Sequence, residues 1–184
     1  MASMVRHAWV NLQVEALSSF EYYGQVIIYS VIGFMVPLLL GHPQLLVGVV
    51  VNAALVLGAL YLDGRGVLPI ILLPSLGVLS RGMIFGPFTV FLVYMIPFIW
   101  VGNSILVFSM KYLYLKRRMM YGVSLGVSAL AKTLFLFGCA FALVKLGVLP
   151  PVFLTTMGTL QLATAAGGGA LSWSVVKARA LVKK

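Results

Sequence analysis

The residue most able to do chemistry in this chain is Lys132, which lies in the middle of an otherwise uncharged stretch from Met119 to Val144. A lysine ammonium at the centre of a bilayer is costly unless something pairs with it, so such a residue is a candidate functional site. The three acids of the chain, Glu15, Glu21 and Asp63, all fall outside the long apolar runs. The partner of Lys132 is therefore expected to be a neutral acceptor, water, another chain or an anionic ligand.

Other polar side chains are expected near Lys132 in the outer half of the membrane. The candidate ligand-binding residues are Lys132, Arg81, Asn52, Thr156, Thr159, Gln161 and Ser128. Two cations among hydroxyls and amides suit an anionic or carboxylate-bearing ligand, which Lys132 would hold as a point charge and Arg81 as a fork. Packing accounts for many of these residues as well. Serine and threonine bond their own helix carbonyls, asparagine bonds between helices, and Arg81 can snorkel to headgroups.

Composition indicates the class of protein and the elements that must position these residues. The chain has 184 residues, of which 62% are hydrophobic and 9% charged, whereas soluble domains carry about 25% charged residues. We expect an all-α bundle of six transmembrane helices, since crossing a bilayer takes about 20 helical residues. The expected spans are Tyr22–Leu40, Leu45–Leu62, Val67–Ile84, Phe88–Met110, Met119–Val144 and Pro151–Val176. Pro69 and Pro74 leave open whether the third is continuous, broken or re-entrant.

The distribution of basic residues predicts that both termini are cytoplasmic. Ten of the 13 Lys and Arg residues fall on the side of the termini, and only Arg81 and Lys145 fall on the other, which is the positive-inside pattern. Residues 1–21 would precede a single transmembrane domain, 22–184. In this leading segment Val5, Trp9 and Leu12 begin a near-helical apolar spacing. That spacing fits an amphipathic helix on the inner membrane surface and fits a frayed terminus equally well.

A run of small residues from 163 to 170 marks the sixth span. Small side chains let helices approach closely, so this run favours tight packing within the bundle. It also offers a face for docking another membrane subunit, formed by Ala163, Ala166, Gly167 and Ala170.

Several classes of function are disfavoured by the sequence. His7, His42 and Cys139 form no catalytic or metal-ligating group, so we expect no enzyme, no metal and no cofactor. The dispersed basic residues argue against nucleic acid as a partner. No acid lies in any expected span to couple transport to ions, and no GxxxxGK[ST] motif is present. A transport role would therefore depend on a partner for its energy.

Three segments carry a resemblance to a known family. They are Gln44 to Asn52 (QLLVGVVVN), Leu73 to Pro87 (LPSLGVLSRGMIFGP) and Ile96 to Asn103 (IPFIWVGN). With six short spans and a basic fourth-to-fifth connection, the chain resembles the substrate-binding S component of energy-coupling factor vitamin transporters, or small prokaryotic six-helix membrane proteins grouped with it. The resemblance implies a multi-pass protein of a prokaryotic cell membrane that captures a small nutrient and docks on a coupling subunit driven by two ATPases.

The chain departs from that family in its first span and first outer connection. Tyr29 to Phe34 carries no Ala-x-x-x-Ala pattern, and the connection from Gly41 to Gln44 is short. The alternative function is a structural subunit of a larger membrane complex, in which Lys132 meets a carboxylate of a neighbouring chain.

Overall fold

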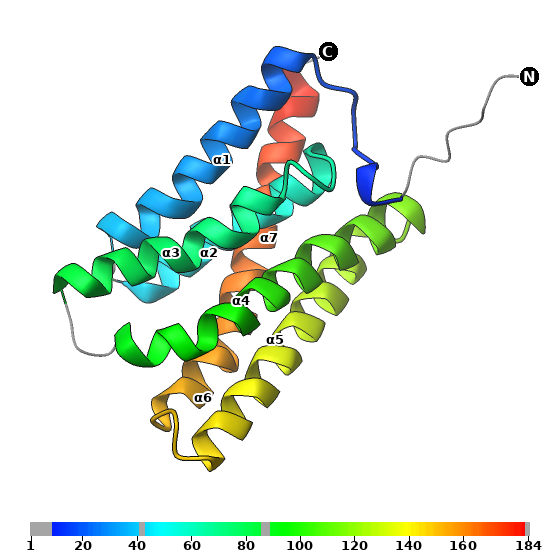
Figure 1. Cartoon of the computed structure of the whole chain (residues 1–184). Coiled ribbons are helices and arrows are strands. Elements are labelled where there is room, and N and C mark those ends of the chain that lie inside the picture. The colour runs from blue at the N-terminus through cyan, green and yellow to red at the C-terminus, as the bar shows by residue number, and fades with distance from the viewer. Residues whose placement is uncertain (1–8, 41–42, 86–88, 183–184) are drawn as a thin grey trace, which may run out of the picture.

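The fold was obtained as a computed structural model that describes residues 9–40, 43–85 and 89–182 (Figure 1). It is 84% helix and has no strand in these ranges, which confirms the all-α prediction. The long helices are α1 (Ser19–Leu39), α2 (Gln44–Tyr61), α3 (Leu68–Phe85), α4 (Thr89–Met110), α5 (Tyr121–Lys145) and α7 (Thr159–Val182). Shorter elements are the 3-10 turn η1 (Trp9–Asn11), the π-helical turn η2 (Lys111–Lys116) and α6 (Val152–Met157).

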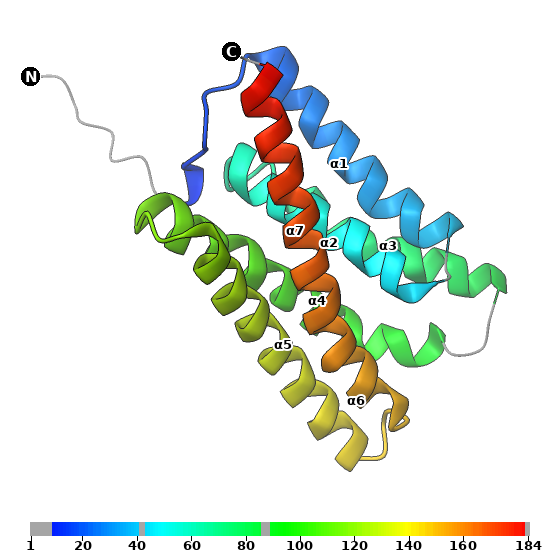
Figure 2. The same ribbon diagram turned by 180° about the vertical axis from the view of Figure 1, so that it is seen from behind.

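The long helices form one bundle in which successive helices run in opposite directions (Figures 1 and 2). Helix α2 lies at its centre and contacts α1, α3, α4 and α7. Every residue of α2 from Asn52 to Tyr61 is buried. The described beginning of the chain and the C-terminal end of α7 lie at the same end of the bundle, which we call the terminal end (Figure 1).

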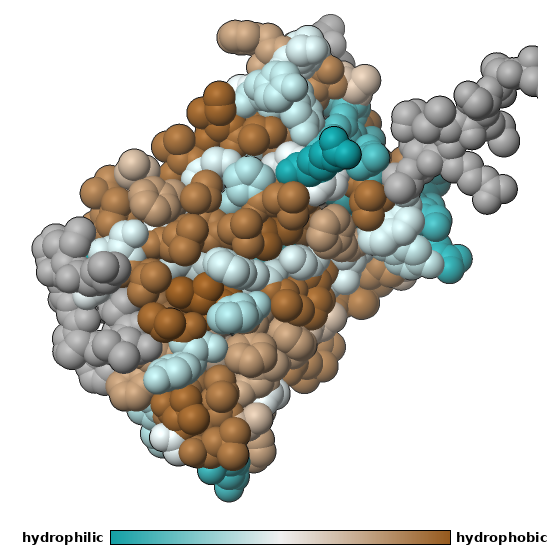
Figure 3. Space-filling model, viewed as in Figure 1, coloured by the Kyte–Doolittle hydropathy of each residue, from teal (hydrophilic) through white to brown (hydrophobic). Residues whose placement is uncertain are grey.

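Four helical stretches are long and apolar enough to cross a membrane: Ser19–Leu39, Gln44–Tyr61, Phe91–Lys116 and Tyr121–Lys145. Large apolar side chains also cover the outside of the bundle, among them Ile27 and Leu134, each 61% exposed. Figure 3 shows this apolar flank, with hydrophilic residues gathered near the beginning of the described chain. Exposing so extensive an apolar surface to water is unfavourable, whereas contact with lipid chains is favourable. The chain is thus a membrane protein.

The structure answers the open question about the third span and corrects the prediction for the sixth. Despite its prolines, α3 is a continuous helix with Pro74 inside it. The run Pro151–Val176, expected as one helix, is instead broken at Gly158 into α6 and α7. A Cβ at Gly158 would lie 2.7 Å from the carbonyl oxygen of Leu154, so the break depends on glycine at this position.

The segment before α1 is neither an amphipathic helix nor a frayed end over its described residues. After η1 the chain is irregular up to Ser18 and packs across the terminal end. The Trp9 ring lies 5.5 Å from the Tyr112 ring, and the buried Lys111 Nζ donates a hydrogen bond to the Leu12 carbonyl at 2.8 Å and a second to Leu62. Tertiary contacts with the bundle, and not the helical spacing of its apolar residues, therefore determine the conformation of this segment. Val5 lies outside the described residues.

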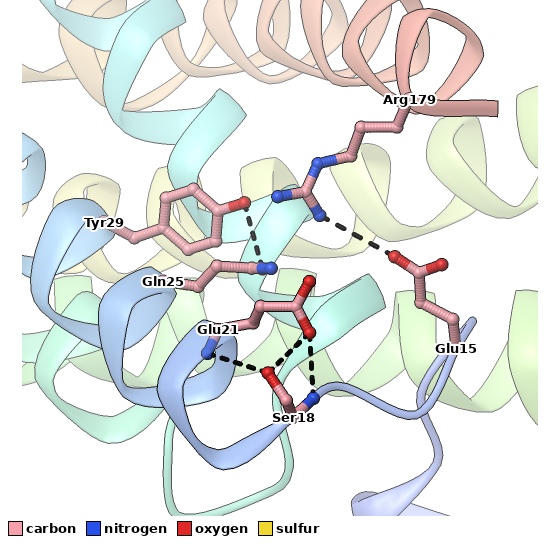
Figure 4. Close-up of polar contacts among 6 residues, drawn as sticks. All are labelled: Glu15, Ser18, Glu21, Gln25, Tyr29 and Arg179. Atoms are coloured by element: carbon pink, nitrogen blue, oxygen red, sulfur yellow. Dashed lines mark hydrogen bonds and ion pairs between the residues drawn. The ribbon is translucent and has the colours of Figure 1, made fainter. Parts of the chain in front are cut away.

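Polar contacts at the terminal end fix where α1 begins and tie the leading segment to α7 (Figure 4). Ser18 Oγ accepts a hydrogen bond from the Glu21 N–H at 3.3 Å, and the Glu21 carboxylate accepts one from the Ser18 N–H at 2.9 Å. This reciprocal capping box starts the helix at Ser19. Glu15 reaches Arg179 of α7 at 4.0 Å.

Asp63 organises the turn between α2 and α3. Its Oδ1 accepts hydrogen bonds from the Tyr22 hydroxyl at 2.6 Å and from the Gly66 and Arg65 N–H groups at 2.7 and 3.1 Å. Burial alone would raise the pKa of this carboxyl, but these hydrogen bonds and the nearby Lys111 charge together lower the pKa below its usual value.

The depressed Asp63 pKa predicts a loss of stability in acid. The unfolded chain binds a proton more readily than the folded one, so the contribution of Asp63 is present above about pH 4 and is lost as the pH falls below that value. Thermal unfolding in detergent should therefore show a lower midpoint at pH 3 than at pH 6. The Asp63→Asn variant, which carries no titrating group there, should have the flatter pH profile. An equal acid sensitivity of both proteins would contradict this role.

Candidate functional site

The central polar contact of the bundle is a hydrogen bond between Lys132 on α5 and Asn52 on α2. Lys132 Nζ donates to Asn52 Oδ1 at 2.7 Å, and each residue is only 2% exposed. Of the kinds of partner expected for Lys132, the structure provides a neutral hydrogen-bond acceptor. A charge-assisted bond of this length is stronger than one between two neutral groups.

Asn52 is oriented by contacts on its other side. Its Nδ2 donates to the Gly48 carbonyl at 2.9 Å and to Thr164 Oγ1 on α7 at 3.1 Å. The Thr164 hydroxyl in turn donates to the Gln161 carbonyl at 3.1 Å. With both amide protons directed at acceptors, the amide oxygen faces the lysine. We call Lys132, Asn52 and Thr164 the lysine cluster, and it joins α5, α2 and α7.

Small residues bring α7 close enough to α2 to complete this cluster. A Cβ on Gly168 would lie 2.7 Å from the Ala53 nitrogen, from Asn52 Cβ and from the Val49 oxygen. Two of these are backbone atoms of α2, which a side chain cannot displace without moving a helix. The small-residue run thus packs within the bundle through Thr164, Ala165, Gly168 and Gly169, all of which are buried.

The expected docking face on the same helix remains partly uncovered. Ala163, Ala166 and Ala170 are exposed, whereas Gly167 is half-buried against Val49. The run therefore divides into an inner face that contacts α2 and an outer face of three alanines.

Two buried serines, Ser128 and Ser124, precede Lys132 on α5 at intervals of four residues toward the terminal end. Ser128, one turn before Lys132, is buried and donates to the Ser124 carbonyl at 2.7 Å. Ser124 Oγ is buried and has no hydrogen-bond partner among the described residues. Ser128 thus satisfies its hydroxyl within its own helix, beside the lysine cluster.

A hollow of about 430 Å³ lies between α5, α6 and α7. Leucines and Phe137 line most of it, and Thr133, Thr155, Thr159 and Gly158 complete the lining. Thr133 follows Lys132 directly, and its buried Oγ1 has no hydrogen-bond partner among the described residues. The hollow is thus bordered by the residue next to Lys132, whose hydroxyl oxygen is itself buried behind the lining.

The remaining candidates lie in different surroundings. Thr156 donates to the Phe153 carbonyl at 3.2 Å, and Thr159 is exposed and lies 3.5 Å from the Thr155 carbonyl. Arg81 lies on α3 and donates to the Leu38 and Leu39 carbonyls at 3.2 and 3.1 Å. The structure thus brings Lys132, Asn52 and Ser128 together and places Arg81 at the C-terminal end of α1. Gln161 joins the cluster only through its backbone carbonyl, which accepts from Thr164.

Lys111 is a buried cation, although the positive-inside pattern counts it among the cations of a cytoplasmic connection. It is fully buried and follows directly on the last residue of α4. In the sequence, Lys111 stands immediately after an apolar run. That position is equally typical of an exposed lysine at the membrane interface, so it does not predict burial. Its two acceptors are carbonyls of distant segments, so only the tertiary structure shows that Lys111 joins the leading segment to the end of α2.

The charge of Lys132 is not balanced by an acid in the described part of the chain. Glu15 pairs with Arg179, Glu21 closes the capping box and Asp63 accepts from Tyr22, all at the terminal end. Among the same residues, no group of His, Cys, Asp and Glu side chains is arranged to hold a metal ion.

Chemically, the lysine cluster contains a positive charge and hydrogen-bond donors, which are the groups that recognise anions. An ammonium has three N–H donors, and Asn52 is the acceptor found for Lys132 in the described ranges. Comparison of the chain with protein-family profiles, with curated proteins and with solved structures finds no match.

Proposed function

We propose that this protein is a membrane-embedded substrate-binding subunit that captures a small anionic solute, with Lys132 supplying the positive charge. The observation that carries the proposal is the buried ammonium whose acceptor, Asn52, is neutral. Burying a charge beside a neutral partner is unfavourable by itself. An anionic ligand would supply the missing counter-charge. In the ligand-free protein, Asn52 holds the ammonium in position by its hydrogen bond.

The proposal includes six membrane crossings with both termini in the cytoplasm of a prokaryotic cell. It is supported by the alternating directions of the long helices (Figure 2). Charge supports it too. The described cations at the terminal end include Arg65, Lys116, Arg117, Arg118 and Lys177, whereas Arg81 and Lys145 lie toward the opposite end. The more basic end faces the cytoplasm by the positive-inside rule.

In this proposal the energy for transport comes from partner proteins. The apolar runs contain no acid for ion coupling and the sequence no phosphate-binding loop. A coupling subunit driven by ATPases, as in energy-coupling factor importers, would fill this need. The outer alanines of α7, Ala163, Ala166 and Ala170, are the candidate contact for that subunit, because small residues allow a close helix approach.

Access to Lys132 is proposed to come through the hollow between α5, α6 and α7. Gly158 lines this hollow and separates α6 from α7, so a hinge at this glycine would let α6 move away from α5. Thr133 would then offer its unused hydroxyl to the solute beside the ammonium.

Ligand-induced stabilisation tests the proposal. Protein in mild detergent would be melted with a panel of small mono- and dicarboxylates and phosphates, since a ligand at 100 times its Kd stabilises the folded state by about 2.7 kcal/mol. At least one compound should raise the midpoint of the wild type and leave Lys132→Met unchanged. Lys145→Met, at the exposed end of the same helix, is the matched control and should respond like the wild type. A panel without any effect on the wild type would count against the proposal.

A structural subunit is the second candidate, and one observation favours it. The Lys132 ammonium already has a hydrogen-bond acceptor and is shielded from solvent. In that case the isolated protein would hold no solute, and it would co-purify in constant proportion with other membrane proteins through all steps.

A further inference from the structure

The terminal end carries a second hollow, separate from the lysine cluster. It has a volume of about 450 Å³ and lies between the leading segment and the connection from α4 to α5. Gln13, Tyr114 and Arg118 contribute polar groups to its lining, and Val14, Leu115 and Met119 contribute apolar ones. A cation, an amide and a hydroxyl beside apolar side chains suit a ligand with an anionic head and a hydrocarbon tail.

Arg118 differs from the two cations that precede it. The Arg117 guanidinium donates to the Tyr112 hydroxyl at 3.0 and 2.8 Å, and Lys116 Nζ lies 5.3 Å from the centre of the same ring. Arg118 instead lines the hollow. Its side chain makes no hydrogen bond or ion pair within the described ranges. Its backbone is left-handed, with φ of 54°, which is uncommon for a residue with a side chain.

The charges around this hollow leave Arg118 available to an anion. Glu15, which follows Val14 in the chain, is 4.0 Å from Arg179. Asp63 accepts from the Tyr22 hydroxyl and from the turn that follows it. Both carboxylates are thus engaged elsewhere, whereas Lys116 and Arg117 add positive charge beside Arg118.

We propose that this hollow binds the phosphate of an anionic phospholipid. A guanidinium can give two parallel N–H bonds to phosphate oxygens, which an ammonium cannot do. The exposed Met119 and Met120 would lie along the acyl chains, since they are 37% and 78% exposed. Trp9, Tyr112 and Tyr114 gather at this end, as aromatic residues do at a membrane interface. Basic pockets at the membrane interface are typical sites for lipid headgroups.

Native mass spectrometry of the full chain tests this inference. Protein released from mixed micelles with equal phosphatidylglycerol and phosphatidylcholine should retain phosphatidylglycerol in excess. Arg118→Asn, which removes the guanidinium and tolerates the left-handed backbone, should reduce this retention about fivefold. Arg65→Asn is the matched control, because it removes an exposed arginine at the terminal end that does not line the hollow. It should retain phosphatidylglycerol like the wild type.

Three outcomes would overturn the lipid site. Equal retention of the two lipids by the wild type would show that the hollow does not select an anion. An equal loss in Arg118→Asn and Arg65→Asn would indicate general attraction to a basic surface. Competition by millimolar inorganic phosphate or glycerol phosphate that removes the lipid completely would assign the site to a free phosphate compound. Circular dichroism of each variant establishes that the helices remain formed.

Discussion

Replacing Asn52 by leucine is expected to lower the free energy of unfolding by about 3 kcal/mol or more, because it leaves the Lys132 ammonium buried without its acceptor. Lys132→Met should cost less, about 1–3 kcal/mol, since it leaves only a neutral amide oxygen without a donor. The double variant should be more stable than the sum of the two losses predicts, because neither group then remains unpaired. Chemical unfolding in detergent, followed by circular dichroism, measures all four proteins.

Asn103→Leu is the matched control for this cycle. Asn103 is 3% exposed and lies on α4, and its Nδ2 donates to the Ile71 carbonyl at 3.0 Å. It is thus an equally buried asparagine without a charged partner, and its replacement should cost about 1 kcal/mol. If Asn52→Leu and Asn103→Leu were equally mild, or if the Lys132 and Asn52 effects simply added, the charged hydrogen bond would not be a principal contact of the bundle.

Gly168→Ala is expected to destabilise the protein by about 1–3 kcal/mol and to loosen α7 from α2. The added Cβ would meet the Ala53 nitrogen and the Val49 oxygen at 2.7 Å, and these atoms belong to the central helix. Because Asn52 Cβ lies equally close, the same change should also disturb the lysine cluster and reduce any response to an anion.

Gly122→Ala provides the contrast on α5. A Cβ there would meet nothing within 4 Å, and alanine favours a helix over glycine by about 0.5–1 kcal/mol. This variant should therefore be as stable as the wild type or more so. Thermal unfolding in detergent measures the stability of Gly168→Ala and Gly122→Ala. A Gly168→Ala protein that melts like Gly122→Ala would contradict the close approach of α7 and α2.

Much of the fold could be predicted from the apolar runs, because each is bounded by glycine, proline or charged residues. The limits of α2 and α5 differ by only a few residues from Leu45–Leu62 and Met119–Val144. The break at Gly158 was missed, since a single glycine within an apolar run is compatible with a continuous helix. The course of the leading segment was missed as well, because it depends on hydrogen bonds from Lys111 to distant carbonyls.

The candidate site was predictable in its composition but not in its pairing. Lys132 stood out because a charge inside a long apolar run is rare, and Asn52 was among the residues named with it. Their contact joins positions 80 residues apart, and no spacing within one helix reveals which helices are neighbours. Arg81 was grouped with Lys132 from membrane depth alone. Depth does not distinguish α3, where Arg81 caps α1, from the interface of α2, α5 and α7.

The most direct measurement of the central claim is mass spectrometry of the small molecules extracted from purified protein. Wild type and Lys132→Met would be prepared in parallel in the same mild detergent, and both would be shown to be folded by circular dichroism. We expect an anionic solute in near-equal molar amount with the wild type and its loss from Lys132→Met. Folded wild-type protein that carries no anion beyond the level of the variant would contradict the proposal that Lys132 receives a negatively charged substrate.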